Sequence, residues 1–248
     1  MLKINNFNTP HETLSRLTEQ LIRYLQLIAP TSSSPRLALS GGETGKQLFN
    51  LWSTSYADNP VWHETHYYWI DERCVPPTDD ESNFGTAKQL FFNPLNICSK
   101  HIYPIHGEIV PQKEACRYTE IVQSQYTPMQ NANFVSSSPF HCAILGIGTD
   151  GHTASIFSLD KQILLPQKYY VTKHPLTGQS RITASMQLLF NIPCIFIGLT
   201  GKKKEWILRN RHQQSVLQHP GTYLLKHHRN IHIFTDSNAL PKKLKSVF

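Results

Sequence analysis

The N-terminal part of the chain carries apolar residues at helical spacing. An amphipathic helix is predicted there, because apolar residues recur every three or four positions between polar ones, at Leu14, Leu17, Leu21, Ile22, Leu25 and Ile28. Such a helix packs one face on a core.

Beyond this helix the pattern changes to short apolar runs separated by polar stretches of helix length. The runs predict strands at 36–39, 67–70, 101–105, 142–145, 169–172, 194–199, 223–225 and 231–234. The stretches between them predict helices at 44–52, 83–91, 113–126 and 203–209. This alternation favours a mostly parallel sheet covered by helices on both faces, and no linker or repeat divides residues 1–248.

The composition of the chain is typical of a folded globular protein. The chain has 248 residues, of which 40% are hydrophobic and 17% charged, so a disordered or fibrous chain is excluded. No stretch has the length of a membrane span or the apolar centre of a signal peptide, which predicts a soluble cytoplasmic protein without membrane contact. The five cysteines lie far apart, so neither a Cys-x-x-Cys metal site nor a disulfide framework is expected.

The net positive charge of the chain indicates which classes of ligand it could bind. The formal net charge is +7, which permits nucleic acid, a membrane surface or a small anion. Apart from the three lysines at 202–204, basic residues gather near the C-terminus at 226–229 and 242–245, where a solvated surface and tail are the simplest interpretation. Isolated cations elsewhere suit one phosphate, whereas nucleic acid needs an extended basic stripe.

A small-residue turn follows the first predicted strand. The sequence from Ser40 through Gly41 and Gly42 to Thr44 and Lys46 leads into a helix, whose free N–H groups favour a phosphate. It is not a Walker A loop, because Ser40 and Gln47 replace the required glycine and hydroxyl residue. An ordinary strand-to-helix turn is an equal alternative at this point.

The loop after the predicted strand 142–145 carries a candidate base. Its sequence 146–151 has the Gly-x-Gly-x-x-Gly form, but no acid follows about 20 residues on to hold a ribose, so a nicotinamide site is not supported. Asp150 and His152 are predicted to stand at the start of a helix over 153–157. The positive end of that helix would disfavour the charged imidazole and suit a general base.

Further charged residues follow other predicted strands. Asp71, Glu72 and Arg73 come directly after the strand 67–70, where we expect them to be solvated in a turn, paired with one another or used to bind a ligand. Arg181 stands between Ser180 and Ile182, and Lys204 ends the short run Lys202–Lys204 after the predicted strand 194–199; a few cations at strand ends suit the binding of one anion.

Taken together, these motifs resemble the 6-phosphogluconolactonases over roughly 37–204. The resemblance rests on Ser-Gly-Gly at 40–42, Asp-Glu-Arg-Cys-Val-Pro at 71–76, Ser-Asn at 82–83, the glycine loop ending in Asp-Gly-His-Thr-Ala-Ser-Ile-Phe at 150–157, Arg-Ile-Thr at 181–183, and Gly201 with Lys204. The chain departs from the family at Glu43-Thr44-Gly45, where Ser-Thr-Pro is usual, and at Ser158, where proline is usual.

The resemblance implies a single three-layer α/β/α domain with a Rossmann-like sheet, shared with glucosamine-6-phosphate deaminases and ribose-5-phosphate isomerases. It implies hydrolysis of 6-phosphoglucono-1,5-lactone in the oxidative pentose phosphate pathway, without metal or cofactor, by a monomer or a weak homo-oligomer.

The roles expected on this basis divide the residues into two groups. His152 takes a proton from water, Asp150 orients the imidazole, and Arg73 stabilises the oxyanion. The phosphate is held by Ser40, Gly41, Gly42 and Thr44 as donors and by Arg181 and Lys204 as counter-charges.

Two alternatives stay open. A glucosamine-6-phosphate deaminase or isomerase would use the same sheet and phosphate turn, but those deaminases read Asp-Glu-Tyr where this chain has Arg73. A non-catalytic protein that binds sugar phosphates or nucleic acid is the second, suggested by the net charge.

Overall fold

The computed structural model describes residues 2–30, 34–124, 129–131, 134–136, 138–159, 168–209 and 218–241. Within these residues six parallel strands form the central sheet. Their order across the sheet is β1 (Leu2–Phe7), β11 (Ile231–Asp236), β10 (Cys194–Leu199), β7 (Cys142–Leu145), β2 (Arg36–Leu39) and β3 (His66–Trp69). The expected mostly parallel sheet is confirmed.

The inner strands are buried along their whole length. Every residue of β2, β7 and β10 is buried. A parallel strand covered on both faces needs such a continuous apolar run, and for this reason the sequence predicts the bounds of these three strands without error.

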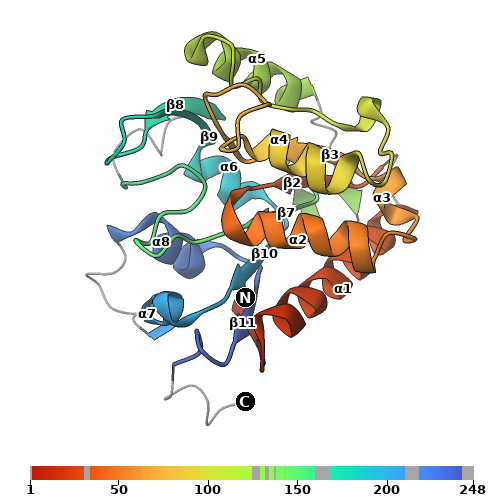
Figure 1. The fold of residues 1–248 in the computed structure, drawn as a ribbon, viewed down its shortest axis with the longest axis vertical. Coiled ribbons are helices and arrows are strands. Elements are labelled where there is room, and N and C mark those ends of the chain that lie inside the picture. Colours follow the sequence, from red (N-terminus) through yellow and green to blue (C-terminus); the bar gives the residue numbers. More distant parts are fainter. Residues whose placement is uncertain are drawn as a thin grey trace.

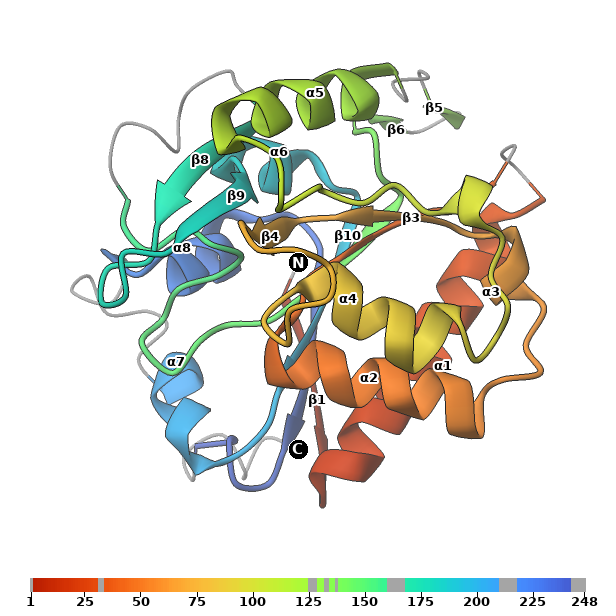
Figure 2. The same ribbon diagram turned by 45° about the horizontal axis from the view of Figure 1, so that its top comes forward.

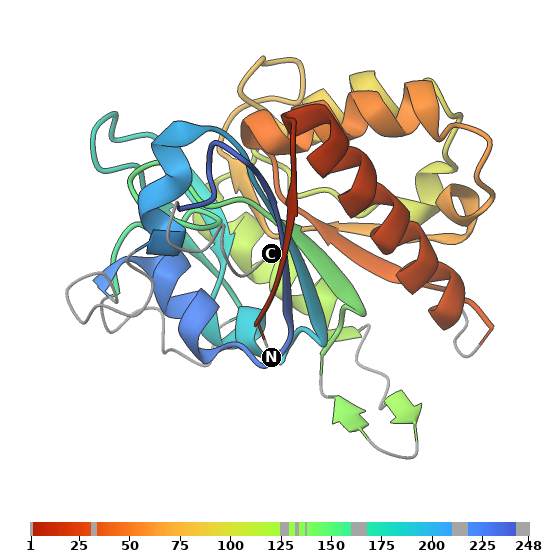
Figure 3. The ribbon, with the colours of Figure 1, turned by 90° about the horizontal axis from the view of Figure 1, so that it is seen from below.

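Helices cover both faces of the sheet (Figures 1 and 2). On one face lie α1 (Pro10–Ile28), α2 (Gly42–Ser55), α3 (Val61–Glu64) and α4 (Asn83–Ala87), which continues as a π-helical turn over Lys88–Phe92. On the other lie α6 (Met186–Asn191) and α8 (Pro220–His227), with α5 (Pro111–Ser124) beyond them. The first helix, α1, begins where Thr9 accepts a hydrogen bond from the N–H of Glu12. Figure 3 shows the sheet between the two groups of helices.

A second, smaller sheet stands beside the first. It is antiparallel, in the order β4 (Asp71–Arg73), β9 (Ser180–Ala184) and β8 (Tyr169–Lys173), and α5 packs against it. The run at 169–172 is therefore a strand, but it belongs to this sheet and not to the parallel one. A further hairpin pairs β5 (Met129–Asn131) with β6 (Phe134–Ser136).

Two predicted strands are wrong. In the segment 101–105 only Ile102 bridges to Tyr67, after a 3₁₀ turn η2 over Ser99–His101, and Pro104 has no N–H with which to continue the pairing. The run 223–225 lies inside α8, which begins at Pro220; three consecutive apolar residues are too few to distinguish the two periodicities.

Some predicted features lie at or beyond the limits of the described residues. The basic run 242–245 and the end of the predicted helix 113–126 fall outside them. Within them, no helix is both long enough and apolar enough to cross a lipid bilayer.

Candidate active site

Two loops leave neighbouring strands at the carboxyl edge of the central sheet. Strands β2 and β7 pair directly, with Leu37 opposite Cys142 and Ala38 opposite Ala143. From β2 the chain moves to β3 on one side, and from β7 it moves to β10 on the other. The strand order therefore reverses between β2 and β7, and ligands of open α/β sheets bind outside such a reversal.

The turn after β2 leaves the first backbone groups of α2 open. Gly42 has a φ of 75°, and Gly41 precedes the helix without a side-chain cap. A Cβ on Gly41 would lie 1.8 Å from Oδ1 of Asn83, so glycine is required where α4 approaches this turn. The free N–H groups and the positive end of α2 favour an anion here. Thr44 lies in the first turn of the same helix.

Lys204 brings a cation to the start of α2. It ends the 3₁₀ turn η4 (Lys202–Lys204), which leads into α7 (Glu205–Arg209) and follows Gly201 at a φ of 86°. Both oxygens of the buried Asp236 accept the N–H of Gly201, at 3.1 and 3.2 Å. Burial lowers the pKa of Lys204, while the carboxylate of Glu43 in the first turn of α2 acts to raise it.

The loop after β7 pairs an imidazole with a carboxylate. Nδ1 of His152 lies 2.6 Å from Oδ1 of Asp150, and 29% of the His152 side chain is exposed. Since a carboxylate accepts hydrogen bonds, Nδ1 carries the proton and Nε2 of a neutral imidazole keeps its lone pair. Burial acts to raise the pKa of Asp150, but the charge and hydrogen bonds of His152 outweigh it and lower this pKa.

The loop is not the helix that the sequence predicts over 153–157. Thr153 forms isolated bridges with Ile147 and Ile156, and Ala154 adopts a φ of 54°. The segment 153–157 therefore supplies no helix dipole to His152, and the prediction based on that helix is wrong; the neighbouring carboxylate of Asp150 orients the ring instead. The pattern of small and polar residues favoured a helix start, but left-handed backbone at Ala154 closes a turn.

Close packing explains the glycines of this loop. A Cβ on Gly148 would lie 2.4 Å from Nδ1 of His152 and 2.5 Å from Oδ1 of Asp150. A Cβ on Gly151, which has a φ of 88°, would meet Trp206 at 2.9 Å. Nε1 of Trp206 also donates to the carbonyl of Thr149 at 2.9 Å. The glycines serve the geometry of the imidazole and carboxylate pair.

The small antiparallel sheet brings two arginines to the same loop. Arg73 on β4 and Arg181 on β9 are directly opposite one another. The Arg181 guanidinium lies 5.9 Å from the ring centre of Phe157, and that ring lies 5.1 Å from the ring of His152. Burial and the charge of Arg73 lower the pKa of Arg181. Arg73 also donates from Nη1 to the carbonyl of Glu81.

The two acids of this segment, Asp71 and Glu72, are buried and bound to other protein groups, so the expectation of a solvated turn is wrong for them. Oδ1 of Asp71 accepts from the Ser40 hydroxyl at 3.0 Å, and Oδ2 accepts from the Ser155 hydroxyl at 2.7 Å. The single hydroxyl hydrogen of Ser40 therefore goes to Asp71 and not to a phosphate. Ser155 and Phe157 have no predicted role, although both stand in the most distinctive motif.

Glu72 holds the start of α4. Its carboxylate accepts the backbone N–H groups of Arg73, Asn83 and Phe84 at 2.7 to 2.8 Å. Burial raises its pKa to about 7, against the effect of these donors. Such an acid, 1% exposed, serves the local fold.

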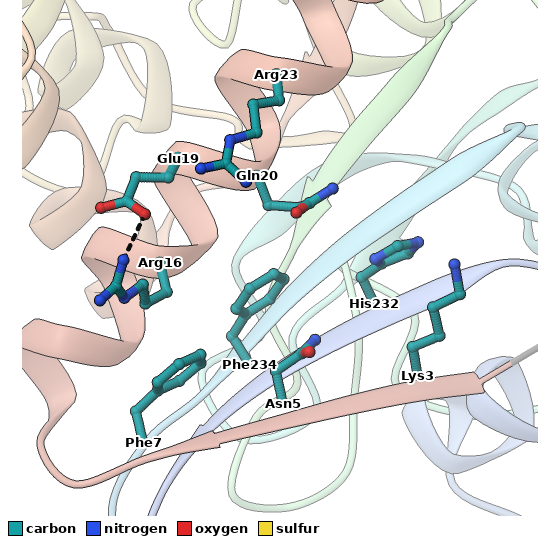
Figure 4. A pocket seen from close by; sticks show the side chains of 9 residues that line it. All are labelled: Lys3, Asn5, Phe7, Arg16, Glu19, Gln20, Arg23, His232 and Phe234. Carbon is teal, nitrogen blue, oxygen red and sulfur yellow. Dashed lines mark hydrogen bonds and ion pairs between the residues drawn. The ribbon is translucent and has the colours of Figure 1, made fainter.

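A groove of about 360 Å³ lies elsewhere, between α1 and the β1 edge of the central sheet (Figure 4). Its lining residues are Lys3, Asn5, Phe7, Arg16, Glu19, Gln20, Arg23, His232 and Phe234. None of them belongs to the predicted site, and Glu19 pairs with Arg16 at 2.9 Å.

Comparisons with known proteins cover nearly the whole chain. The family model for glucosamine-6-phosphate isomerases/6-phosphogluconolactonase matches residues 8–233. A 6-phosphogluconolactonase of Haemophilus influenzae is 33% identical over 82% of this chain and 83% of its own length. One from Treponema pallidum is 32% identical over 69% of this chain and 70% of its own.

Solved structures agree with the fold. The devB protein has a TM-score of 0.84 at 30% identity, with both chains covered in full. A monomeric glucosamine-6-phosphate deaminase has a TM-score of 0.76 at 17% identity, covering 96% of this chain and 98% of its own, and shows the shared fold alone.

Proposed function

The chain belongs to the glucosamine-6-phosphate isomerase/6-phosphogluconolactonase family, and from this premise we propose that it hydrolyses 6-phospho-D-glucono-1,5-lactone to 6-phospho-D-gluconate. This is the second step of the oxidative pentose phosphate pathway. The observation that carries the proposal is the 2.6 Å contact of Asp150 with Nδ1 of His152, because it leaves the lone pair of Nε2 available as a base.

The reaction needs a base, an oxyanion partner and a phosphate site. Nε2 of His152 takes a proton from water as the water oxygen attacks C1 of the lactone. The bond from C1 to the ring oxygen then breaks, and the imidazolium returns the proton to the departing alkoxide. Asp150 keeps the ring oriented and stabilises its charged form. A δ-lactone is an activated ester, so this sequence requires no covalent nucleophile.

Arg73 is proposed to stabilise the negative charge that develops on the C1 oxygen. The support is its place opposite Arg181, whose guanidinium lies over a ring that contacts His152. Both arginines thus belong to the antiparallel sheet next to the His152 loop.

The phosphate is proposed to bind at the start of α2, to the N–H groups of Gly41 and Gly42 and the hydroxyl of Thr44. Lys204 and Arg181 supply counter-charge to a group that carries about −1.5 to −2 at neutral pH. Because the Ser40 hydroxyl donates to Asp71, only the backbone of Ser40 is available to the phosphate, and its side chain serves to shape the turn.

The deaminase alternative is less well supported. Those deaminases read Asp-Glu-Tyr where this chain has Asp71-Glu72-Arg73, and each oxygen of Asp71 already accepts a serine hydroxyl. The other alternative is a non-catalytic protein that binds nucleic acid or sugar phosphates, and it does not account for the pairing of Asp150 with His152.

We place the enzyme in the cytoplasm as a monomer that binds neither membrane nor nucleic acid. The free state of all five cysteines suits a reducing compartment.

The proposal is tested with the purified protein and freshly oxidised glucose 6-phosphate. Lactone decay is followed with and without protein, and ammonia release from glucosamine 6-phosphate is measured in parallel. Accelerated lactone decay without ammonia supports the lactonase. Ammonia release, or salt-sensitive nucleic-acid binding without hydrolysis, would contradict it.

A further inference from the structure

We propose that Asp71 is a positioning residue that ties the phosphate turn to the His152 loop, a role that rests on the proposed function. Each of its carboxylate oxygens holds one of the two segments. Oδ1 binds Ser40, which directly precedes Gly41, and Oδ2 binds Ser155, which follows His152 by three residues. These partners come from segments far apart in the sequence.

The carboxylate is itself held in place. Asp71 is 4% exposed, and its backbone carbonyl accepts Nδ2 of Asn83 at 2.9 Å. Asn83 in turn packs against Gly41, where it leaves no room for a Cβ. The far side of the bridge is fixed as well, because the N–H of Ser155 donates to Oγ1 of Thr183 on β9 at 3.2 Å. The bridge therefore joins α2, α4, β9 and the catalytic loop.

The same contacts favour a positioning role over contact with substrate. Asp71 is almost fully buried, and each of its carboxylate oxygens already accepts a hydroxyl from the protein. An ionised carboxylate is costly to bury, and charge-assisted hydrogen bonds of 2.7 and 3.0 Å offset that cost. An asparagine of the same shape would accept from only one of the two serines.

The two halves of the bridge have separable consequences. The bond to Ser40 shapes the turn that receives the phosphate, so its loss should affect substrate binding. The bond to Ser155 restrains the loop that carries the imidazole, so its loss should affect turnover. A side chain that merely supported the fold would lower stability without separating KM from kcat.

The test measures kcat and KM for the phosphorylated lactone, and calorimetric affinity for inorganic phosphate, in three variants. Ser155→Ala should lower kcat about tenfold with KM and phosphate affinity within about twofold. Ser40→Ala should raise KM about tenfold, weaken phosphate and leave kcat within about twofold. Asp71→Asn should do both. Ser55→Ala, at the exposed last residue of α2, is the control and should change neither constant.

The role of Asp71 is overturned if both serine variants keep wild-type constants, or if both change the same constant by the same factor. A wild-type protein without lactonase activity would refute the proposed function. The positioning role would then still be supported by weaker phosphate binding in Ser40→Ala and Asp71→Asn but not in Ser155→Ala, and refuted by equal affinity in all variants.

Discussion

The central parallel sheet and the small antiparallel sheet contribute different side chains to the candidate site. From the parallel sheet come the glycine turn after β2, the His152 loop after β7 and, through η4, Lys204. From the antiparallel sheet come Arg73 and Arg181. The proposed base and the proposed anion-binding backbone thus follow buried, apolar strands, whereas the arginines belong to strands that are largely polar.

The comparison teaches that one site can have two different structural origins. Strands β2 and β7 are fixed by their own burial and place their loops at the strand-order reversal. Strand β4 has the polar sequence Asp-Glu-Arg and forms because β9 pairs with it. The carboxylates of Glu72 and Asp71 also accept hydrogen bonds from other segments, which stabilises the strand. Substitutions in the two sheets should therefore change different steps of the reaction.

The largest effect is expected at the end of the parallel sheet. His152→Ala removes the base and should lower kcat about 10²- to 10⁴-fold, because positioned proton transfer contributes that much. Steady-state kinetics measures this, and an unchanged melting temperature shows that the fold is retained. His227→Ala, an exposed histidine of α8, is the matched control. Near-normal turnover in His152→Ala would remove it as the base.

A smaller effect is expected from the antiparallel sheet. Arg181→Ala should raise KM for the phosphorylated lactone about 10- to 100-fold and leave kcat nearly unchanged, because it removes a charged hydrogen-bond partner of the phosphate. The same measurement on a lactone without phosphate should show little change. Equal losses on both substrates would contradict the assignment of Arg181 to the phosphate.

Lys204→Met tests whether the parallel sheet also contributes to phosphate binding. The change keeps the apolar stem and removes the charge beside Glu43, so KM should rise about tenfold with kcat retained. Lys203→Met, whose side chain is exposed on the same turn, is the control. A KM that rises equally in both variants would indicate a general loss of positive potential.

The smallest effect is the pH dependence of stability caused by Glu72 on strand β4 of the antiparallel sheet. The pKa of Glu72 is raised to about 7 in the folded protein from an ordinary value of 4.5. The folded state thus keeps a proton that the unfolded chain releases, and the stability gained below pH 4.5 is lost as pH rises through 7. Across this window the free energy of unfolding should fall by about 1–3 kcal/mol.

Glu72→Gln, measured by urea unfolding at several pH values, should flatten that slope. A wild-type protein whose stability rises between pH 5 and 7, with the same rise in Glu72→Gln, would contradict the raised pKa.

Much of the fold follows from apolar runs, and much of the site follows from residues just after them. The Ser-Gly-Gly turn and the Asp150 and His152 pair stand directly after buried strands, where a parallel sheet places its ligands. Strand β9 could not be predicted, because its sequence Ser-Arg-Ile-Thr-Ala has no clear alternation and its pairing is decided by distant partners.

The missed parts of the site depend on contacts between distant segments. Asp71 meets Ser155 across 84 positions of sequence, and no local pattern encodes that contact. The sequence predicts a helix over 153–157 where the structure has a turn, because the left-handed φ that Ala154 adopts is rare for alanine.

The most direct test of the account compares kcat/KM for the phosphorylated and unphosphorylated 1,5-lactones in the wild type, His152→Ala and Arg181→Ala. The account predicts that His152→Ala lowers kcat/KM for both lactones by the same large factor, and that Arg181→Ala removes most of the preference for the phosphorylated one. A wild type that hydrolyses neither lactone, or a His152→Ala variant that hydrolyses both at the normal rate, would contradict it.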